Sequence, residues 1–344
     1  MAQTRTVIIG ISGCSSSGKT TLARLLRDIF PETFILHEDD FYKPESELPI
    51  KHGLADWDCP EAISIPDLEA ALTHVRATGT FPVSSRVPTT SPCTLSRRSN
   101  HGCTSFTSPT PLSPPLTPLP PSSSSPPSTT TRSTQLTKTP TRNSPQPTVN
   151  SIEDLNSVGP CPATPQQIAS CTATVQTWLA PNNPGSLIFP PPSSSTKKKT
   201  RICILDGFLL YAPQTSSPPT PLSRIPPLLD IKLFLQASKA KALHRRGARD
   251  GYVHVDGFWT DPPGYVEKIV WPNYVEAHRW LFEGGDVEGG RVDQEVLGRE
   301  GILVPCVNGE EVEFGGMLEW AVGAVMGELE RICLGEGRDG GKGE

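Results

Sequence analysis

Short apolar runs alternate with longer segments of helical rhythm at both ends of this 344-residue chain. The short runs are rich in β-branched residues and span residues 6–12, 33–37, 201–206, 230–235 and 302–307. Apolar residues at helical spacing occupy residues 21–30, 65–76, 238–250, 266–282 and 317–334. Because strands that alternate with helices build parallel sheets covered by helices, the pattern predicts an α/β protein.

The middle of the chain has a different composition. Residues 82–150 are mostly Ser, Thr and Pro, and the whole chain holds 38 prolines. Such a segment buries too little apolar surface to offset its chain entropy, so we expect disorder there. Its proline runs and Ser/Thr-Pro sites suit modular-domain or phospho-dependent partners. The favoured alternative is an insertion without a role, because long loops cost little stability.

This change of composition divides the chain into four parts. We expect a folded core at 1–81 and 201–334, an insertion at 82–200 and a flexible tail at 335–344. A helical apolar rhythm predicts one helix at 165–180 inside the insertion.

Charge and cysteine content exclude several classes of protein. Residues 82–200 carry nine Lys/Arg against two acids, which leaves the remainder at −12 of a total of −5 and argues against a nucleic-acid-binding surface. Nine cysteines without a C-x-x-C pair indicate neither disulfides nor zinc, and favour a reducing compartment. No apolar run is long enough to span a bilayer and no signal segment is evident. We expect a cytoplasmic protein without a membrane partner, and Lys197–Lys199 leaves the nucleus open as a second compartment.

Residues 13–20, Gly-Cys-Ser-Ser-Ser-Gly-Lys-Thr, match the phosphate-loop pattern G-x-x-x-x-G-K-[ST] between an expected strand and an expected helix. Glycines at the two ends allow backbone N–H groups to converge on phosphate oxygens. Lys19 would reach the β and γ phosphates of ATP, and the Thr20 hydroxyl would bind Mg²⁺. The alternative, a Gly-Ser turn before an ordinary helix, is disfavoured by this context. The expected nucleotide contacts are Gly13, Cys14, Ser15, Ser16, Ser17, Gly18, Lys19, Thr20 and Thr21.

Acidic residues follow two of the expected strands. Glu38, Asp39 and Asp40 come after the second strand, and Asp206 ends the third. In an open parallel sheet this edge binds ligands, where a carboxylate accepts a proton or orients Mg²⁺. A solvated turn or helix cap would explain the adjacent acids equally well if they stood alone. The phosphate loop upstream favours a chemical role for Asp39.

Two further groups invite either a functional or a structural interpretation. Trp57 beside Asp58 fits a base-stacking face next to a ribose-binding carboxylate, although tryptophan is more often part of a core. Arg245, Arg246 and Arg249 suit a helical lid that closes on phosphates, or else form a basic solvent-exposed face.

The order of these motifs resembles the nicotinamide riboside kinase family, within the uridine kinase and phosphoribulokinase-like group of P-loop kinases. The resemblance covers residues 5–80 and 200–333. Its most specific parts are residues 9–23, 39–47 (Asp-Asp-Phe-Tyr-Lys-Pro-Glu-Ser-Glu), 57–58, 206–210 (Asp-Gly-Phe-Leu-Leu), 245–246, 263–265 and 271–272. It implies a three-layer P-loop kinase fold with a five-stranded parallel sheet and a helical lid.

The resemblance also implies roles for individual residues. Asp39 would be the general base toward the ribose 5′-hydroxyl, and Lys19 would assist catalysis. Asp58 and Arg246 would bind the ribose hydroxyls, and Trp57 would stack on the cationic nicotinamide ring. The remaining implied contacts are Asp40, Phe41 and Tyr42 for the substrate, Arg245 and Arg249 for the nucleotide phosphates, and Thr20, Asp39 and Asp206 for Mg²⁺.

The expected function is therefore ATP-dependent phosphorylation of nicotinamide riboside to nicotinamide mononucleotide. The sequence departs from the family pattern at Trp57, where tyrosine is familiar, at Asp206, where glutamate is familiar, and by extra residues at 251–259. The alternatives are a uridine or cytidine kinase, or a catalytically silent nucleotide-binding scaffold that acts through its insertion. Intact Lys19 and Asp39 argue against the scaffold, and the lack of an N-K-x-D motif disfavours a GTPase.

Overall fold

The apolar runs form the centre of a computed structural model that describes residues 3–82, 159–191, 198–214, 219–249, 251–254, 257–310 and 312–335. The disorder predicted for 82–150 and for the tail lies almost entirely outside these residues. The chain divides into two units of contacts, and every described residue belongs to the unit formed by Met1–Val87 and Val149–Glu344.

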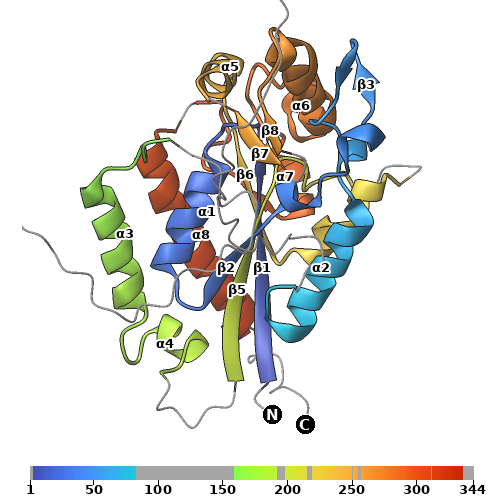
Figure 1. The fold of residues 1–344 in the computed structure, drawn as a ribbon. Coiled ribbons are helices and arrows are strands. Elements are labelled where there is room, and N and C mark those ends of the chain that lie inside the picture. Colours follow the sequence, from blue (N-terminus) through green and yellow to red (C-terminus); the bar gives the residue numbers. More distant parts are fainter. Residues whose placement is uncertain are drawn as a thin grey trace, which may run out of the picture. The chain divides into compact units, whose positions relative to one another are not determined.

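Five parallel strands form the sheet, in the order β2-β5-β1-β6-β9 (Figure 1). The strands are β1 (Gln3–Gly13), β2 (Thr33–His37), β5 (Lys198–Asp206), β6 (Ile231–Leu235) and β9 (Ile302–Leu303). The α/β fold with five parallel strands is thus confirmed. The last strand is shorter than the predicted 302–307, because Pro305 has no N–H to donate to a ladder.

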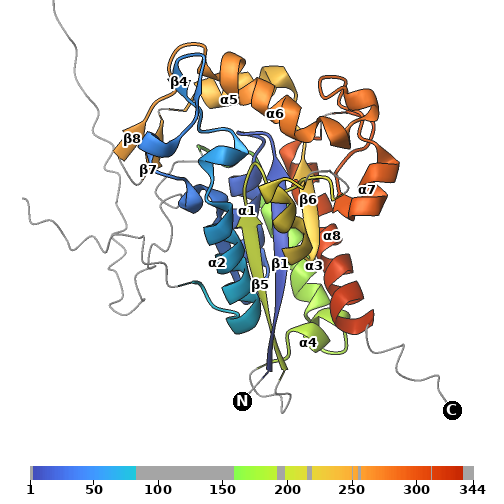
Figure 2. The same cartoon turned by 90° about the vertical axis from the view of Figure 1, so that its right-hand side faces the viewer.

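Side chains that alternate along the central strands supply two apolar layers. On β1, Ile8 joins the core under one face of the sheet, whereas Val7, Ile9 and Ile11 join the core under the other. Helix α2 (Ile65–Thr78) covers the first face. Helices α1 (Lys19–Ile29) and α8 (Phe314–Leu334) cover the second, so the sheet is the middle of three layers (Figures 1 and 2).

Two helices after the proline-rich segment extend the second layer. Helix α3 (Pro165–Trp178) starts with a capping box between Thr164 and Gln167, and α4 (Pro184–Ile188) follows it. The Trp178 indole is buried, meets the Phe30 ring edge-on at 6.2 Å, and donates to Glu330 Oε1 at 2.7 Å. Residues 159–191 therefore pack as part of the helical layer, although the sequence grouped them with the insertion.

The second half of the chain builds a cap over the carboxyl ends of the strands (Figure 2). It comprises α5 (Lys239–Gly247), the hairpin of β7 (Tyr252–His254) and β8 (Gly257–Trp259), a π-helical turn (Val266–Val270) and α6 (Trp271–His278). The helix predicted over 266–282 is continuous but irregular, since Pro272 interrupts the regular hydrogen bonding. Helix α5 ends three residues earlier than predicted, so Arg249 lies beyond it.

The remaining elements are the hairpin of β3 (Ile50–Lys51) and β4 (Leu54–Ala55), helix α7 (Gln294–Glu300) and several 3₁₀ turns. Within the described ranges, the helices are too short or too polar to span a bilayer.

A buried histidine in the cap makes stability depend on pH. The His278 ring packs against the Tyr274 ring at a 34° tilt, with centroids 4.6 Å apart, and donates from Nδ1 to the Tyr274 carbonyl at 3.0 Å. Burial lowers the pKa of His278 from 6.5 to about 4. Between these values the unfolded chain binds the proton and the folded chain does not, so acidification lowers the free energy of unfolding.

We expect this one histidine to account for up to about 3 kcal/mol of the loss between pH 6.5 and about 4. Urea unfolding of the unaltered protein and of His278→Phe, measured across this window, tests the expectation. The variant should lose less stability on acidification. An identical pH dependence in both proteins would contradict it.

Candidate active site

The phosphate loop lies between β1 and α1, as the motif predicts. Its backbone has positive φ at Gly13 (141°), Ser16 (63°) and Gly18 (103°), which turns successive N–H groups into one concavity. A β-carbon at Gly13 would collide with the backbone of Leu235 on β6, so only glycine fits there. Lys19 is buried and donates from Nζ to the carbonyls of Gly13 and Cys14 at 3.0 and 2.9 Å.

The cysteine of the loop has a structural side chain. Burial raises the pKa of the Cys14 thiol to about 12, so the thiol stays protonated and unreactive. Its part in phosphate binding would come from the backbone. Thr20 and Thr21 lie half-buried in the first turn of α1, where the helix dipole favours anions.

Asp206 lies at the same edge as the loop, at the carboxyl end of β5. Although burial alone would raise the pKa of Asp206, hydrogen bonds from His37 and Thr20 and the charge of Lys19 lower it, which keeps the carboxylate ionised. His37 Nδ1 lies 3.1 Å from Asp206 Oδ2. Asp206 Oδ1 is buried without a hydrogen-bond partner in the described part of the chain. An orphaned carboxylate oxygen beside Thr20 is the donor type that suits Mg²⁺.

Asp39 belongs to the 3₁₀ turn Glu38–Phe41 directly after β2. Since β2 pairs with β5 and His37 stands opposite Asp206, this turn begins at the carboxyl edge that also holds the phosphate loop. Asp39 is half-buried, and its charge adds to the burial that raises the pKa of Tyr42. The structure therefore brings Thr20, Asp39 and Asp206 to one edge of the sheet. Among the described residues, no group of three His, Cys, Asp or Glu side chains forms a metal cage by itself.

Arg246 joins the phosphate loop to the expected substrate residues. Its guanidinium binds the Asp58 carboxylate through two bonds of 2.7 and 3.1 Å, and Nη1 donates to Ser15 Oγ at 3.0 Å. A second carboxylate, Asp261, accepts from the other edge at 2.7 and 3.1 Å. Burial opposes the charged form, but the two carboxylates and Tyr252 raise the pKa of Arg246 well above its ordinary value. Arg246 thus stays charged although it is only 7% exposed.

The other two arginines, Arg245 and Arg249, do not take part in the Arg246–Asp58 ion pair. Arg245 Nη1 donates to the Ser16 carbonyl at 3.4 Å, which places Arg245 over the loop. The Arg249 guanidinium stacks over the Tyr252 ring at 5.1 Å. Of the three lid arginines, Arg245 and Arg246 therefore donate hydrogen bonds to the phosphate loop, whereas the contact defined for Arg249 is with Tyr252.

Aromatic rings surround Trp57. The Tyr42 ring meets it edge-on at 5.3 Å, and the Trp259 ring lies at 5.8 Å with a 54° tilt. Tyr42 also stacks on Phe208 at 6.3 Å. Trp57 is buried in this aromatic wall, as its structural interpretation expects, and its contact with a ligand stays a prediction. Asp40 and Phe41 share the turn with Asp39 and are half-buried.

Sequence reasoning missed several residues of this site. Trp259 and Asp261 lie in or beside the lid segment that had no assigned role, and the only available signal was a tryptophan two residues before an acid. Tyr265 accepts the Trp57 backbone N–H on its hydroxyl at 3.0 Å. Asn273 donates to both carboxylate oxygens of Asp56 at 2.9 Å. Tyr265, from the motif at 263–265, and Asn273, which directly follows the motif at 271–272, therefore hold the loop that carries Trp57 and Asp58.

The tyrosine contact can be tested with Tyr265→Phe. This change leaves a buried N–H without its acceptor, at a cost of about 1–3 kcal/mol, so the loop should lose its fixed position. We expect KM for the acceptor substrate to rise about fivefold or more, with KM for the nucleotide unchanged. Tyr211→Phe is the matched control, because the Tyr211 hydroxyl contacts Gly10 and Leu233 carbonyls on the central strands. Equal KM values in both variants would contradict the assignment.

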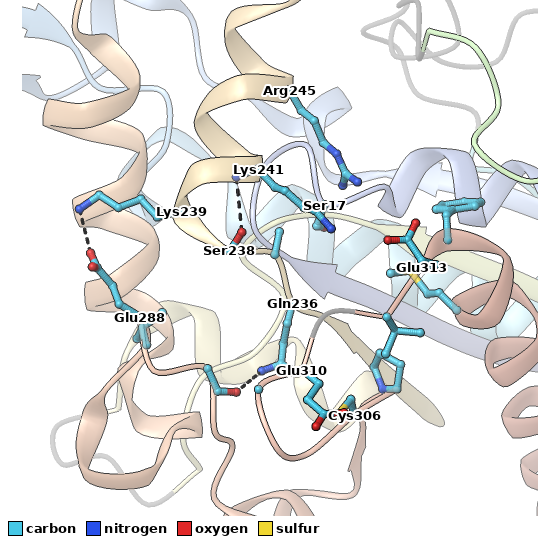
Figure 3. Close-up of a pocket in the computed structure, with 18 of the residues that line it drawn as sticks. Ser17, Gln236, Ser238, Lys239, Lys241, Arg245, Glu288, Cys306, Glu310 and Glu313 are labelled. Carbon is cyan, nitrogen blue, oxygen red and sulfur yellow. Dashed lines mark hydrogen bonds and ion pairs between the residues drawn. The ribbon is translucent and has the colours of Figure 1, made fainter.

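A pocket adjoins the phosphate loop at Ser17 (Figure 3). Lys241 and Arg245 reach into it from α5, above Ser17 and Glu313. Lys239, in contrast, pairs with Glu288 at 2.8 Å on its rim. Pro162 and Phe314 complete the wall near the start of α8. The pocket thus meets the phosphate loop at Ser17, whereas Arg246 connects the loop to Asp58 through Ser15.

Known proteins resemble the chain over nearly its whole length, although no family model matches it. It is 26% identical to nicotinamide riboside kinase of Schizosaccharomyces pombe over 95% of this chain and 99% of that protein. Nicotinamide riboside kinase of Eremothecium gossypii is 24% identical, over 93% and 92% of the two chains. Human nicotinamide riboside kinase 1 is 43% identical over 70 residues, which are 20% of this chain and 35% of the human protein. The resemblance that the motifs carry is therefore confirmed, and the chain is a relative of proteins named nicotinamide riboside kinase.

Proposed function

We propose that the protein transfers the γ-phosphoryl group of ATP to the 5′-hydroxyl of nicotinamide riboside, giving nicotinamide mononucleotide and ADP in NAD salvage. One observation carries the proposal: the phosphate loop and the carboxylates of Asp39 and Asp206 lie at one edge of the sheet, and Arg246 connects that loop to Asp58. A new bond forms between the ribose 5′-oxygen and the γ-phosphorus. The bond from the γ-phosphorus to the β,γ-bridging oxygen breaks, and the hydroxyl proton passes to Asp39.

The donor side rests on the phosphate loop. Its N–H groups and the start of α1 hold the phosphates, and Lys19 exchanges its present carbonyl partners for phosphate oxygens. Arg245 adds positive charge from the lid, and the pocket of Figure 3 receives the nucleoside end of ATP. These groups neutralise charge that develops in the transition state.

Mg²⁺ fits the residues at the edge of the sheet. Thr20 would hold it directly, and Asp206, through its orphaned buried oxygen, would hold it directly or through water. Asp39 would complete the set from the turn after β2. The ion would supply positive charge that neutralises the phosphates of ATP.

The acceptor side discriminates by charge. Nicotinamide riboside has a cationic ring, which the electron-rich face of Trp57 favours, while the charges of Asp58 and Arg246 are already satisfied by each other. The remaining lone pairs of the Asp58 carboxylate suit the ribose hydroxyls. The five N–H groups of Arg246 already have acceptors, so a bond from Arg246 to the ribose would replace one of them, such as the bond to Ser15. Asp39 then has the 5′-hydroxyl as its hydrogen-bond donor and steers it toward the γ-phosphorus.

Coupled ADP release with a panel of nucleosides tests the proposal. A cation over a desolvated indole gains about 1–2 kcal/mol, so kcat/KM for nicotinamide riboside should exceed that for uridine by about tenfold or more. Phosphorus NMR of the product should place the new phosphate on the 5′-oxygen. Good turnover of uridine with none of nicotinamide riboside would reassign the protein to the uridine kinases.

A further inference from the structure

Glu38 is the most deeply buried acid of the site and has no role in the chemistry proposed above. Its side chain is fully buried, although it precedes Asp39 in the chain. Oε2 accepts the backbone N–H groups of Phe208 and Leu209 at 2.7 and 3.0 Å. These two residues belong to the loop that starts directly after Asp206. One carboxylate therefore joins the segments that carry the two functional acids.

The surroundings of Glu38 are shaped for this contact. A β-carbon on Gly207 would lie 2.6 Å from Glu38 Oε2 and 2.7 Å from Glu38 Cβ, so only glycine lets the carboxylate approach the loop. From β1, the Ser12 hydroxyl lies 3.4 Å from both the Phe208 carbonyl and the Leu210 N–H. The loop after β5 is thus fastened to both neighbouring strands.

We propose that Glu38 is a positioning residue that ties the turn bearing Asp39 to the loop after Asp206 and so fixes the two carboxylates relative to each other. The inference rests on the proposed function, in which Asp39 orients the acceptor hydroxyl and Asp206 helps to hold Mg²⁺. His37 does not duplicate this role. It contacts the Asp206 carboxylate, whereas Glu38 holds the backbone that follows.

The contact requires a side chain of the length of Glu38, and it does not require a negative charge. Both donors are neutral backbone amides, so a neutral acceptor of the same length satisfies them with a somewhat weaker bond. A shorter carboxylate keeps the charge but draws the acceptor away from the loop. Glu38→Gln and Glu38→Asp therefore separate the two properties.

We expect Glu38→Asp to lower kcat about 10- to 100-fold, because small displacements of catalytic groups cost rates of that order. Glu38→Gln should keep kcat within about threefold of the unaltered protein. KM for both substrates should change little in either variant. The control is Glu300→Asp, a shortened acid that is 8% exposed and lies at the end of α7, and it should leave kcat unchanged.

A second readout does not depend on activity. Hydrogen exchange of the Phe208 and Leu209 amides should accelerate in Glu38→Asp and stay slow in Glu38→Gln. Rates are compared on whichever nucleoside the unaltered protein phosphorylates. A different substrate would therefore contradict the proposed function but leave this test of Glu38 valid. An unchanged kcat in Glu38→Asp, or a Gln variant as slow as the Asp variant, would overturn the inference.

Discussion

Asp39→Asn should lower kcat by about 10²–10⁴ while ATP binds about as well as before. The carboxylate follows β2 at the edge that holds the phosphate loop, where it can take the proton of the attacking hydroxyl. An amide of the same shape cannot accept that proton. Single-turnover kinetics with saturating riboside, together with calorimetry of ATP binding, measure the two quantities separately.

The matched control for Asp39→Asn is Glu45→Gln, which neutralises an exposed acid in the next 3₁₀ turn. This variant should keep the full rate, because Glu45 lies outside the site. If Asp39→Asn retained wild-type turnover, Asp39 would not be the base. If ATP binding fell as steeply as the rate, the residue would serve the nucleotide instead.

Arg246→Leu should both unfold more easily and lose affinity for the riboside. Removal of one partner from a buried ion pair leaves an uncompensated charge, which costs about 3–5 kcal/mol of the free energy of unfolding. Here Asp58 and Asp261 would both lose their partner. The donor of the expected ribose contacts would also be missing, so KM for the riboside should rise about 100-fold or more.

Two further variants separate stability from binding. Arg246→Leu combined with Asp58→Asn removes the unpaired charge at the substrate loop, so urea unfolding should recover part of the lost stability while the rate stays low. Arg246→Lys should also raise KM for the riboside, since an ammonium cannot make the paired bonds of a guanidinium. If Arg246→Leu alone kept the original KM for the riboside, Arg246 would not belong to the acceptor site.

Much of the fold follows from local sequence. Each buried strand is an apolar run with its own flanking turn residues, and the phosphate loop is a continuous motif whose glycines have the positive φ values it requires. Element ends were less predictable. Pro305 shortens the last strand and Pro272 distorts the helix around it, because both effects depend on the missing N–H groups of single residues.

The residues of the site were predictable where they belong to a continuous motif. They were not predictable where residues far apart in the sequence come into contact. Placing Thr20, Asp39 and Asp206 at one edge follows from parallel strand topology. Tyr265 is 208 positions from the backbone N–H that it accepts, and Asp261 becomes a partner of Arg246 only through the lid fold. Glu38 looked like one acid in a polar turn, because nothing local reveals that its side chain turns inward.

A crystal structure with Mg²⁺, a non-hydrolysable ATP analogue and nicotinamide riboside would measure the distance on which the proposed chemistry depends. We predict an Asp39 carboxylate oxygen within about 2.6–3.2 Å of the ribose 5′-oxygen, with that oxygen directed at the γ-phosphorus. A riboside bound away from the wall of Trp57 and Asp58, or an Asp39 carboxylate beyond hydrogen-bond reach of the 5′-oxygen, would contradict the assignment.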